Sequence, residues 1–108
     1  GLLIDARRMA AASGAALAID LRLVPLSEAF LACLGDGREA RLAAATAGDD
    51  YELLFAAPAG RGREILALSE SLGLPLTRIG AVEEGAALHL SDRGEQVPLP
   101  EKLGWEHG

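Results

Sequence analysis

Two features of this sequence could contribute chemistry to a binding site: an acidic pair and a single tryptophan. Asp49 and Asp50 stand directly before the apolar segment 51–57. A carboxylate there can accept a hydrogen bond from an amine or balance a positively charged ring. The same carboxylates can instead bind backbone amides of a turn that leads into a strand. On the residues alone the turn role is favoured for both, and for Asp50 it is the interpretation we keep.

Trp105 is the only tryptophan, and it follows Gly104 in a polar tail. Its ring could lie over a cationic heteroaromatic group, where stacking and cation–π attraction contribute about 0.5–2 kcal/mol. The alternative is that the ring attaches the C-terminal tail to the domain. The sequence does not decide between the two roles.

Other reactive residues form no recognisable motif. His89 lies in a predicted strand and His107 in the tail, and without clustered carboxylates the two make a poor zinc site. The glycine-rich segment 60–62 lacks the Lys-Ser/Thr of a phosphate-binding loop. Cys33 is the only cysteine, which excludes an internal disulfide, and we expect it to be a small core residue. We therefore predict no metal ligands and no catalytic side chain within this chain.

Composition limits the class of protein. The 108 residues are 50% apolar, which fits one folded domain, and no apolar run is long enough to cross a membrane. The net charge of −6 argues against general binding to nucleic acid, because the phosphate backbone is itself negative. The negative net charge does not exclude binding of a small phosphorylated ligand, provided that basic side chains cluster at its binding site.

The spacing of apolar and turn residues predicts the order α-β-α-α-β-α-β-β-β. A first helix should end at Gly14, and Ser27 should cap a short helix that buries Phe30, Leu31 and Leu34. A last helix should end at Gly73. The expected strands cover residues 17–23, 51–57, 76–82, 87–90 and 97–99.

Details of the strands refine this prediction. In the first strand Asp20 and Arg22 alternate with apolar residues, so they should face water or a partner. Segment 51–57 lacks such alternation and is predicted to be a central strand covered on both faces. Segment 92–94 has the composition of a three-residue hairpin loop. The fold class is α+β, with helices packed on a mixed or antiparallel sheet.

Three segments in this order carry a family resemblance: a helix that begins Gly1-Leu2-Leu3 and ends Ala12-Ser13-Gly14, residues 47–55 (AGDDYELLF), and residues 73–80 (GLPLTRIG). With the terminal Gly104-Trp105, the chain resembles the C-terminal domain of the thiamine-monophosphate kinase family. That family belongs to the superfamily of aminoimidazole ribonucleotide synthetase and selenophosphate synthetase. The resemblance therefore implies the fold of the C-terminal domain of aminoimidazole ribonucleotide synthetase.

The resemblance also implies a function. Members of this family transfer the γ-phosphoryl group of ATP to thiamine phosphate with magnesium ions (Mg2+), in the cytoplasm, as homodimers formed by an N-terminal domain. Asp49 occupies the place of an acidic residue, often Glu, that contacts the thiamine substrate. Trp105 occupies the place of an aromatic residue that lies against it. The implied partners are thus thiamine phosphate and ATP, with no nucleic acid and no membrane.

The chain departs from the family at its start. An Asp-x-Ser-Asp stretch with magnesium and nucleotide ligands normally precedes the position of Gly1. We therefore interpret residues 1–108 as a single C-terminal, substrate-side domain of a truncated kinase, without the N-terminal ATP and dimerisation domain. We predict that this chain alone is inactive, because phosphoryl transfer depends on bound magnesium.

Two alternatives remain. The first is another enzyme of the same superfamily, against which the segment 48–53 (GDDYEL) and the terminal aromatic residue argue. The second is a non-catalytic α+β module that binds a small molecule or mediates assembly. The sequence that precedes Gly1 in a longer protein would separate these from the kinase.

Overall fold

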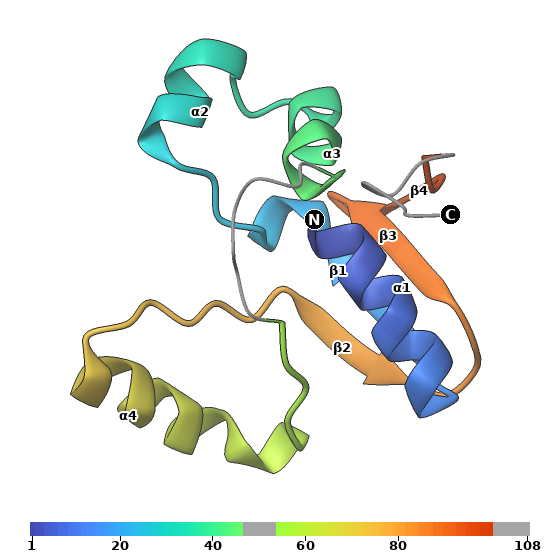
Figure 1. Ribbon diagram of the computed structural model, residues 1–108, viewed down its shortest axis with the longest axis vertical. Coiled ribbons are helices and arrows are strands. Elements are labelled where there is room, and N and C mark those ends of the chain that lie inside the picture. Colours follow the sequence, from blue (N-terminus) through green and yellow to red (C-terminus); the bar gives the residue numbers. More distant parts are fainter. Residues whose placement is uncertain (47–53, 101–108) are drawn as a thin grey trace.

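The structure is a computed structural model that describes residues 1–46 and 54–100. Within them the chain forms α-helices, two short 3-10 helices and one β-sheet (Figure 1). The elements are α1 (Leu2–Ser13), β1 (Ala16–Asp20), η1 (Leu21–Leu23), α2 (Glu28–Leu34), α3 (Arg38–Thr46), η2 (Ala59–Arg61), α4 (Gly62–Leu72), β2 (Gly80–Glu83), β3 (Leu88–Asp92) and β4 (Glu95–Val97).

The sheet has four strands in the order β2-β1-β3-β4. β1 pairs parallel with β3, whereas the pairs β1–β2 and β3–β4 are antiparallel. The predicted α+β fold with helices packed on a mixed sheet is confirmed. Asp20 of β1 and Ser91 of β3 are partners in the parallel register, so the carboxyl ends of the two central strands meet at one edge.

Helix α1 covers one face of the sheet (Figure 1) and supplies much of the core. The helix ends where predicted, at Gly14, whose φ of 64° is the left-handed conformation that glycine adopts without strain. Leu3 is 0% exposed and belongs to one buried cluster with apolar residues of β1 and β3. Full burial of each such leucine contributes roughly 1.5–3 kcal/mol. The main buried residues are Leu3, Ile4, Ala6, Ala10, Leu17, Ile19, Leu21, Leu88, Leu90 and Val97.

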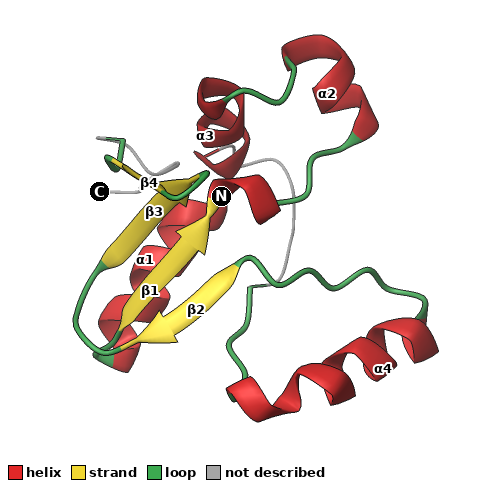
Figure 2. Cartoon of the chain, turned by 180° about the vertical axis from the view of Figure 1, so that it is seen from behind, coloured by secondary structure: helices red, strands yellow, loops and turns green. Residues whose placement is uncertain are grey.

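The opposite face of the sheet is open in the described part of the chain. Figure 2 shows the strands from this side, with α1 behind them and no described helix in front. Side chains alternate along a strand, so Ala18 and Asp20 of β1 face this side together with their register partners His89 and Ser91 of β3. Small and polar side chains therefore form this surface.

Two strand boundaries differ from the predicted ones. β1 ends at Asp20 and not at residue 23, because the Asp20 side chain accepts a hydrogen bond from the backbone N–H of Arg22 at 2.9 Å and begins η1. β2 begins only at Gly80, and residues 74–79 before it form no regular element. Both predicted strands were thus too long at one end.

The hairpin between β3 and β4 also differs. Asp92 pairs with Glu95, so the loop has two residues and not the predicted three. Arg93 and Gly94 have φ values of 53° and 81°. Positive φ at both positions is the pattern of a type I′ turn, whose twist matches that of the strands.

The prediction of a central strand over residues 51–57 is wrong for residues 54–57, the part of this segment that the structure describes. Residues 54–57 form no strand, and Phe55 is 53% exposed, while residues 51–53 lie outside the described ranges. The central positions belong to β1 and β3, which already pair on both sides. Pro58 follows directly, lacks a backbone N–H and restricts the residue before it, so a ladder cannot continue there.

Helix α2 begins as predicted but does not enter the core. The Ser27 hydroxyl accepts a hydrogen bond from the N–H of Phe30 at 3.1 Å, which confirms the cap. Leu31 and Leu34 are nevertheless exposed. Cys33, expected in the core, is exposed as well, because α2 as a whole contributes no buried residue.

Helix α4 lies beyond β2 and apart from α1 (Figure 1). It ends at Gly73 as predicted, with φ of 65°. It contributes no buried residue, and Leu66, Leu68 and Leu72 are exposed. Among the described residues, the core thus belongs to α1, the sheet and the segments next to them.

Candidate functional site

The two side chains predicted to bind substrate, Asp49 and Trp105, lie outside the described residues, as does Asp50. Their roles therefore stay predictions. The structure instead has a pocket on the open face of the sheet. Sequence reasoning did not identify it as a site.

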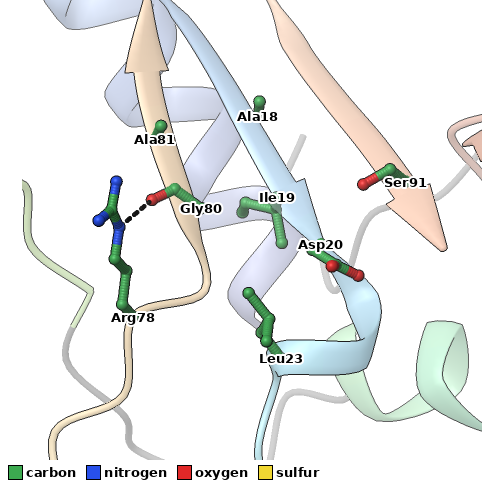
Figure 3. A pocket seen from close by; sticks show the side chains of 8 residues that line it. All are labelled: Ala18, Ile19, Asp20, Leu23, Arg78, Gly80, Ala81 and Ser91. Carbon is green, nitrogen blue, oxygen red and sulfur yellow. Dashed lines mark hydrogen bonds between the residues drawn. The ribbon is translucent and has the colours of Figure 1, made fainter. Parts of the chain in front are cut away.

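The sheet-face pocket has a volume of about 320 Å³ and opens toward solvent (Figure 3). Its floor consists of Ala18, Gly80 and Ala81, from the adjoining strands β1 and β2. Leu23, 47% exposed, adds an apolar wall. Because these floor residues carry at most a methyl group, the bottom of the pocket is flat and largely apolar.

Gly80 is required for this geometry. A Cβ atom added to Gly80 would lie 1.8 Å from the carbonyl oxygen of Ala18, which no packed structure tolerates. The absence of a side chain lets β2 approach β1 closely at the pocket floor.

Three polar side chains line the pocket: Asp20, Arg78 and Ser91 (Figure 3). Asp20 and Ser91 stand at the carboxyl ends of the parallel strands β1 and β3. Ligands of sheets with parallel strands are commonly bound just outside this edge. The Nε–H of Arg78 donates to the carbonyl of Gly80 at 3.5 Å, a long and weak hydrogen bond.

Only part of the lining of this pocket could be predicted from the sequence. Alternation in the first strand correctly placed Asp20 on the face away from the core. The positions of Ser91 and Arg78 depend on strand pairing across many residues, which no local pattern reveals.

Next to the pocket, a network of ion pairs is centred on Asp92. This carboxylate is 2% exposed, and its two oxygens accept hydrogen bonds from the Nε–H of Arg22 at 2.5 Å and of Arg38 at 2.8 Å. These two bonds lower the pKa of Asp92 to about 2. Arg38 also pairs with Glu95 at 3.0 Å. Arg22, expected to face water or a partner, thus has a partner within the chain.

Arg41 extends this network through backbone groups. Its guanidinium donates to the carbonyl oxygens of Leu21 and Val24 at 3.0 and 3.3 Å, and to that of Asp36 at 2.9 Å. The arginines therefore join α3 to η1 and to the end of β3. We interpret the network as structural support for the edge of the sheet, since its donors are already engaged by protein acceptors.

Magnesium does not fit the described residues. Over residues 1–46 and 54–100, no group of three or more His, Cys, Asp or Glu side chains is placed to hold a metal ion. We therefore derive no chemical step through a metal from these residues. In the same ranges, no helix is both long and apolar enough to cross a membrane.

Comparison with known proteins gives the family. Residues 1–93 match the family described as AIR synthase related protein, C-terminal domain. The chain is 33% identical over 111 residues to the thiamine-monophosphate kinase of Caulobacter vibrioides, covering 100% of this chain and 31% of that protein. It is 34% identical over 108 residues to the thiamine-monophosphate kinase of Aquifex aeolicus, covering 99% of this chain and 31% of that protein.

A solved structure agrees with these relatives. The crystal structure of thiamine-monophosphate kinase from Stenotrophomonas maltophilia K279a matches with a TM-score of 0.78 and 43% identity, over 90% of this chain and 30% of that chain. The chain thus spans 31% of the length of the first curated relative it matches. Since the family match extends over residues 1–93, the chain belongs to the AIR synthase related protein, C-terminal domain family.

Proposed function

We propose that this chain is the substrate-side domain of a thiamine-monophosphate kinase, which forms thiamine diphosphate from thiamine phosphate and ATP. One observation carries the proposal: the chain aligns along essentially its whole length with relatives that bear this name. The fold is supported at 43% identity by a solved kinase of the same name.

Within this proposal, two residues of the chain contact the substrate. Asp49 accepts a hydrogen bond from the thiamine amine or balances its positive ring. Trp105 lies over the heterocycle, where stacking and cation–π attraction add to binding. Magnesium neutralises phosphate charge during transfer. Its ligands, the ATP site and a homodimer interface come from outside this chain, in a cytoplasmic enzyme.

A chimeric enzyme tests the proposal directly. This chain would replace the matching 31% of the Caulobacter vibrioides kinase, and thiamine diphosphate would be measured with ATP and magnesium present. We expect the chimera to form product. We expect neither this chain alone nor the relative without its matching part to do so. The chain alone serves as the control, because its described residues offer no cluster for a metal.

Two results would contradict the proposal. The first is a chimera that folds and binds ATP but forms no thiamine diphosphate. The second is ATP turnover that depends on another acceptor, which would favour a different enzyme of the AIR synthase related superfamily. Activity of the isolated chain above a protein-free control would overturn its assignment as a substrate-side domain.

A further inference from the structure

Helix α4 lacks the packing that a helix of its length needs. It has 11 residues, none of them buried, and its main neighbour is the short η2 that precedes it. Isolated helices shorter than about 12–15 residues are marginal in water. Ile65, Leu68 and Leu72 recur at helical spacing and form one side of the helix, which we call the α4 apolar face. Leu68 and Leu72 are 50% and 58% exposed, so this face is available for packing against another surface.

The chain as a whole exposes more surface than its size requires. It exposes 7804 Å² for a mass of 11.2 kDa, whereas a compact folded chain of this mass exposes roughly 5,700 Å². Its radius of gyration is 14.1 Å, against roughly 13 Å for a compact domain of about this length. The excess of roughly 2,000 Å² is as large as a stable interface between two proteins. The open arrangement therefore leaves room for one more large contact.

The open face of the sheet is the second surface without a cover in the described part of the chain. β1 and β3 form a parallel pair, and parallel strands are typically covered on both faces. Ala18 of β1 and Ala81 of β2 are directly opposed in register, and Gly80 beside them has no side chain. Leu23 adds an exposed apolar wall. These small residues form a level floor on which a helix can lie close to the strands.

The connection from α4 to the sheet is long enough for the two surfaces to meet. The N–H of Leu74 donates to the carbonyl of Ser69 at 3.2 Å, so Leu74 belongs to the end of the helix. The carbonyl of Ile79 accepts from the N–H of Asp20 at 2.8 Å, which fixes Ile79 to β1. Residues 75–78 between them form no regular element. The chain from Leu74 to Ile79 can span up to roughly 17 Å, more than the roughly 10 Å that separates packed layers.

We propose that α4 is a flap that closes over the open face of the sheet and that the sheet-face pocket is its seat. In the closed arrangement Leu68 and Leu72 lie on the methyl groups of Ala18 and Ala81, and residues 75–78 act as the hinge. The contact removes apolar surface of both partners from water, which is the main favourable contribution to packing. While the flap is closed, the pocket floor is not accessible to a ligand. This proposal does not depend on the kinase assignment.

The polar groups of the pocket do not prevent closure. Ser91 of β3 lies on the other side of β1 from Ala81 (Figure 3), so a helix over β1 and β2 leaves its hydroxyl uncovered. Asp20 stands at the end of β1, and its carboxylate already accepts from the N–H of Arg22. A flap over the alanine floor therefore leaves both polar side chains at its rim.

The short hinge favours closure within one chain over pairing of two copies. A short flexible connection holds two surfaces at an effective concentration in the mM range, on the order of a thousandfold above a protein solution of a few μM. Helix α2 also has exposed leucines, but it is less free to move. The carbonyl of Asp36, just beyond its end, accepts hydrogen bonds from Arg22 and Arg41. The α4 apolar face is thus the better cover for the sheet.

Nuclear Overhauser effects between methyl groups test the closed arrangement in the 108-residue chain. With Ala and Leu methyl groups isotope-labelled, we expect cross-peaks from Leu68 or Leu72 to Ala18 or Ala81. Such peaks require close contact, whereas in the open arrangement α4 lies apart from α1 and beyond β2 (Figure 1). An isotope-filtered spectrum of labelled chain mixed with unlabelled chain reports contacts between copies. We expect the cross-peaks to be absent from that spectrum.

Matched substitutions on α4 assign the contact to one face. Leu66 is 61% exposed and lies about 160° around the helix from Leu68. Gln has nearly the helix propensity of Leu, so the three Leu→Gln variants differ mainly in the face they change. Leu68→Gln and Leu72→Gln should weaken the cross-peaks that remain and lower the urea midpoint by roughly 0.5–1 M. Leu66→Gln should leave both unchanged.

Three results would overturn the flap. The first is the absence of cross-peaks between α4 and the alanine floor in the parent chain. The second is cross-peaks in the isotope-filtered spectrum, which would identify a second copy as the partner of the α4 apolar face. The third is equal urea midpoints for the Leu66, Leu68 and Leu72 variants, which would show that this face is as exposed in solution as the rest of the helix.

Discussion

Asp92 and Arg22 form a close ion pair, 2.5 Å between the carboxylate and Nε, although 70 positions separate them in the sequence. The pair joins the end of β3 to η1, and Arg38 attaches α3 to the same carboxylate. Because Asp92 is 2% exposed, these bonds also replace the water that the carboxylate loses on folding. The carboxyl edge of the sheet, where the pocket lies, is thus fixed by charge as well as by apolar packing.

The first prediction concerns pH. The hydrogen bonds from Arg22 and Arg38 lower the pKa of Asp92 from 3.8 to about 2. A group whose pKa is lower in the folded state stabilises the fold above its unfolded pKa and loses this effect as pH falls through the folded pKa. We therefore expect the contribution of Asp92 to decline between about pH 4 and pH 2.

Thermal unfolding across this pH range measures the effect. Asp92→Asn should be less stable than the parent at neutral pH, and the difference between the two should shrink as the pH falls toward 2. Glu64→Gln is the control, because Glu64 is 68% exposed and its pair with Arg61 lies on the surface of α4. Parallel pH profiles for the parent and Asp92→Asn would show that the network does not hold the carboxylate in its charged form.

The second prediction concerns the close approach of β2 to β1. In Gly80→Ala the new Cβ atom would lie 1.8 Å from the Ala18 carbonyl oxygen, so the backbone must move. We expect a loss of about 1–3 kcal/mol or more in the free energy of unfolding, as for other overpacked sites. Urea denaturation measures it.

Gly62→Ala is the matched control for Gly80→Ala. Gly62 has φ of −58°, and a Cβ atom there would meet nothing within 4 Å. Alanine is the better helix former by roughly 1 kcal/mol, so this change should stabilise α4 or leave the protein unaffected. If both alanine variants unfold at the same urea concentration, the clash at Gly80 is relieved without cost and the argument for this glycine fails.

Local signals explain which parts of the fold were predictable. Gly14 ends α1 and Ser27 caps α2, as expected, because each acts through neighbouring backbone groups. The parallel pairing of Asp20 with Ser91, by contrast, depends on the whole path of the chain between them. Hydrophobicity alone also predicted burial that the structure does not have, because Leu31 and Leu34 of the correctly predicted α2 are exposed.

For the candidate site, too, local sequence patterns predicted only part of the arrangement. The outward direction of Asp20 follows from alternation in one strand, so the sequence sufficed for it. Arg78 and Ser91 join it only through the pairing of three strands, and the partner of Arg22 is 70 positions away. Asp49 and Trp105 came from motif resemblance and lie outside the described residues, so their assignment still depends on experiment.

The third prediction concerns Asp49 in the chimeric kinase. Asp49→Ala should weaken the binding of thiamine phosphate by roughly 1.5–3 kcal/mol, the range for a lost hydrogen bond to a charged group, and leave ATP binding nearly unchanged. Asp49→Glu should be milder, because it retains the carboxylate. Calorimetric titration with each ligand separates the effects. Equal losses for both ligands would mean that Asp49 orders the turn and does not contact substrate.

The last prediction concerns Trp105, the one tryptophan of this chain, whose fluorescence emission can be read separately in the longer enzyme if the rest of that enzyme has no tryptophan. If its ring covers the thiamine heterocycle, thiamine phosphate should quench or shift the fluorescence. In the chimera, Trp105→Ala should weaken the substrate by about 0.5–2 kcal/mol, whereas Trp105→Phe should keep much of the affinity because stacking needs a flat ring. Equal affinities of the Ala and Phe variants would exclude a stacking role. Emission that is already blue-shifted without ligand and resists iodide would instead identify Trp105 as a residue that attaches the tail, since a buried indole is shielded from both water and quencher.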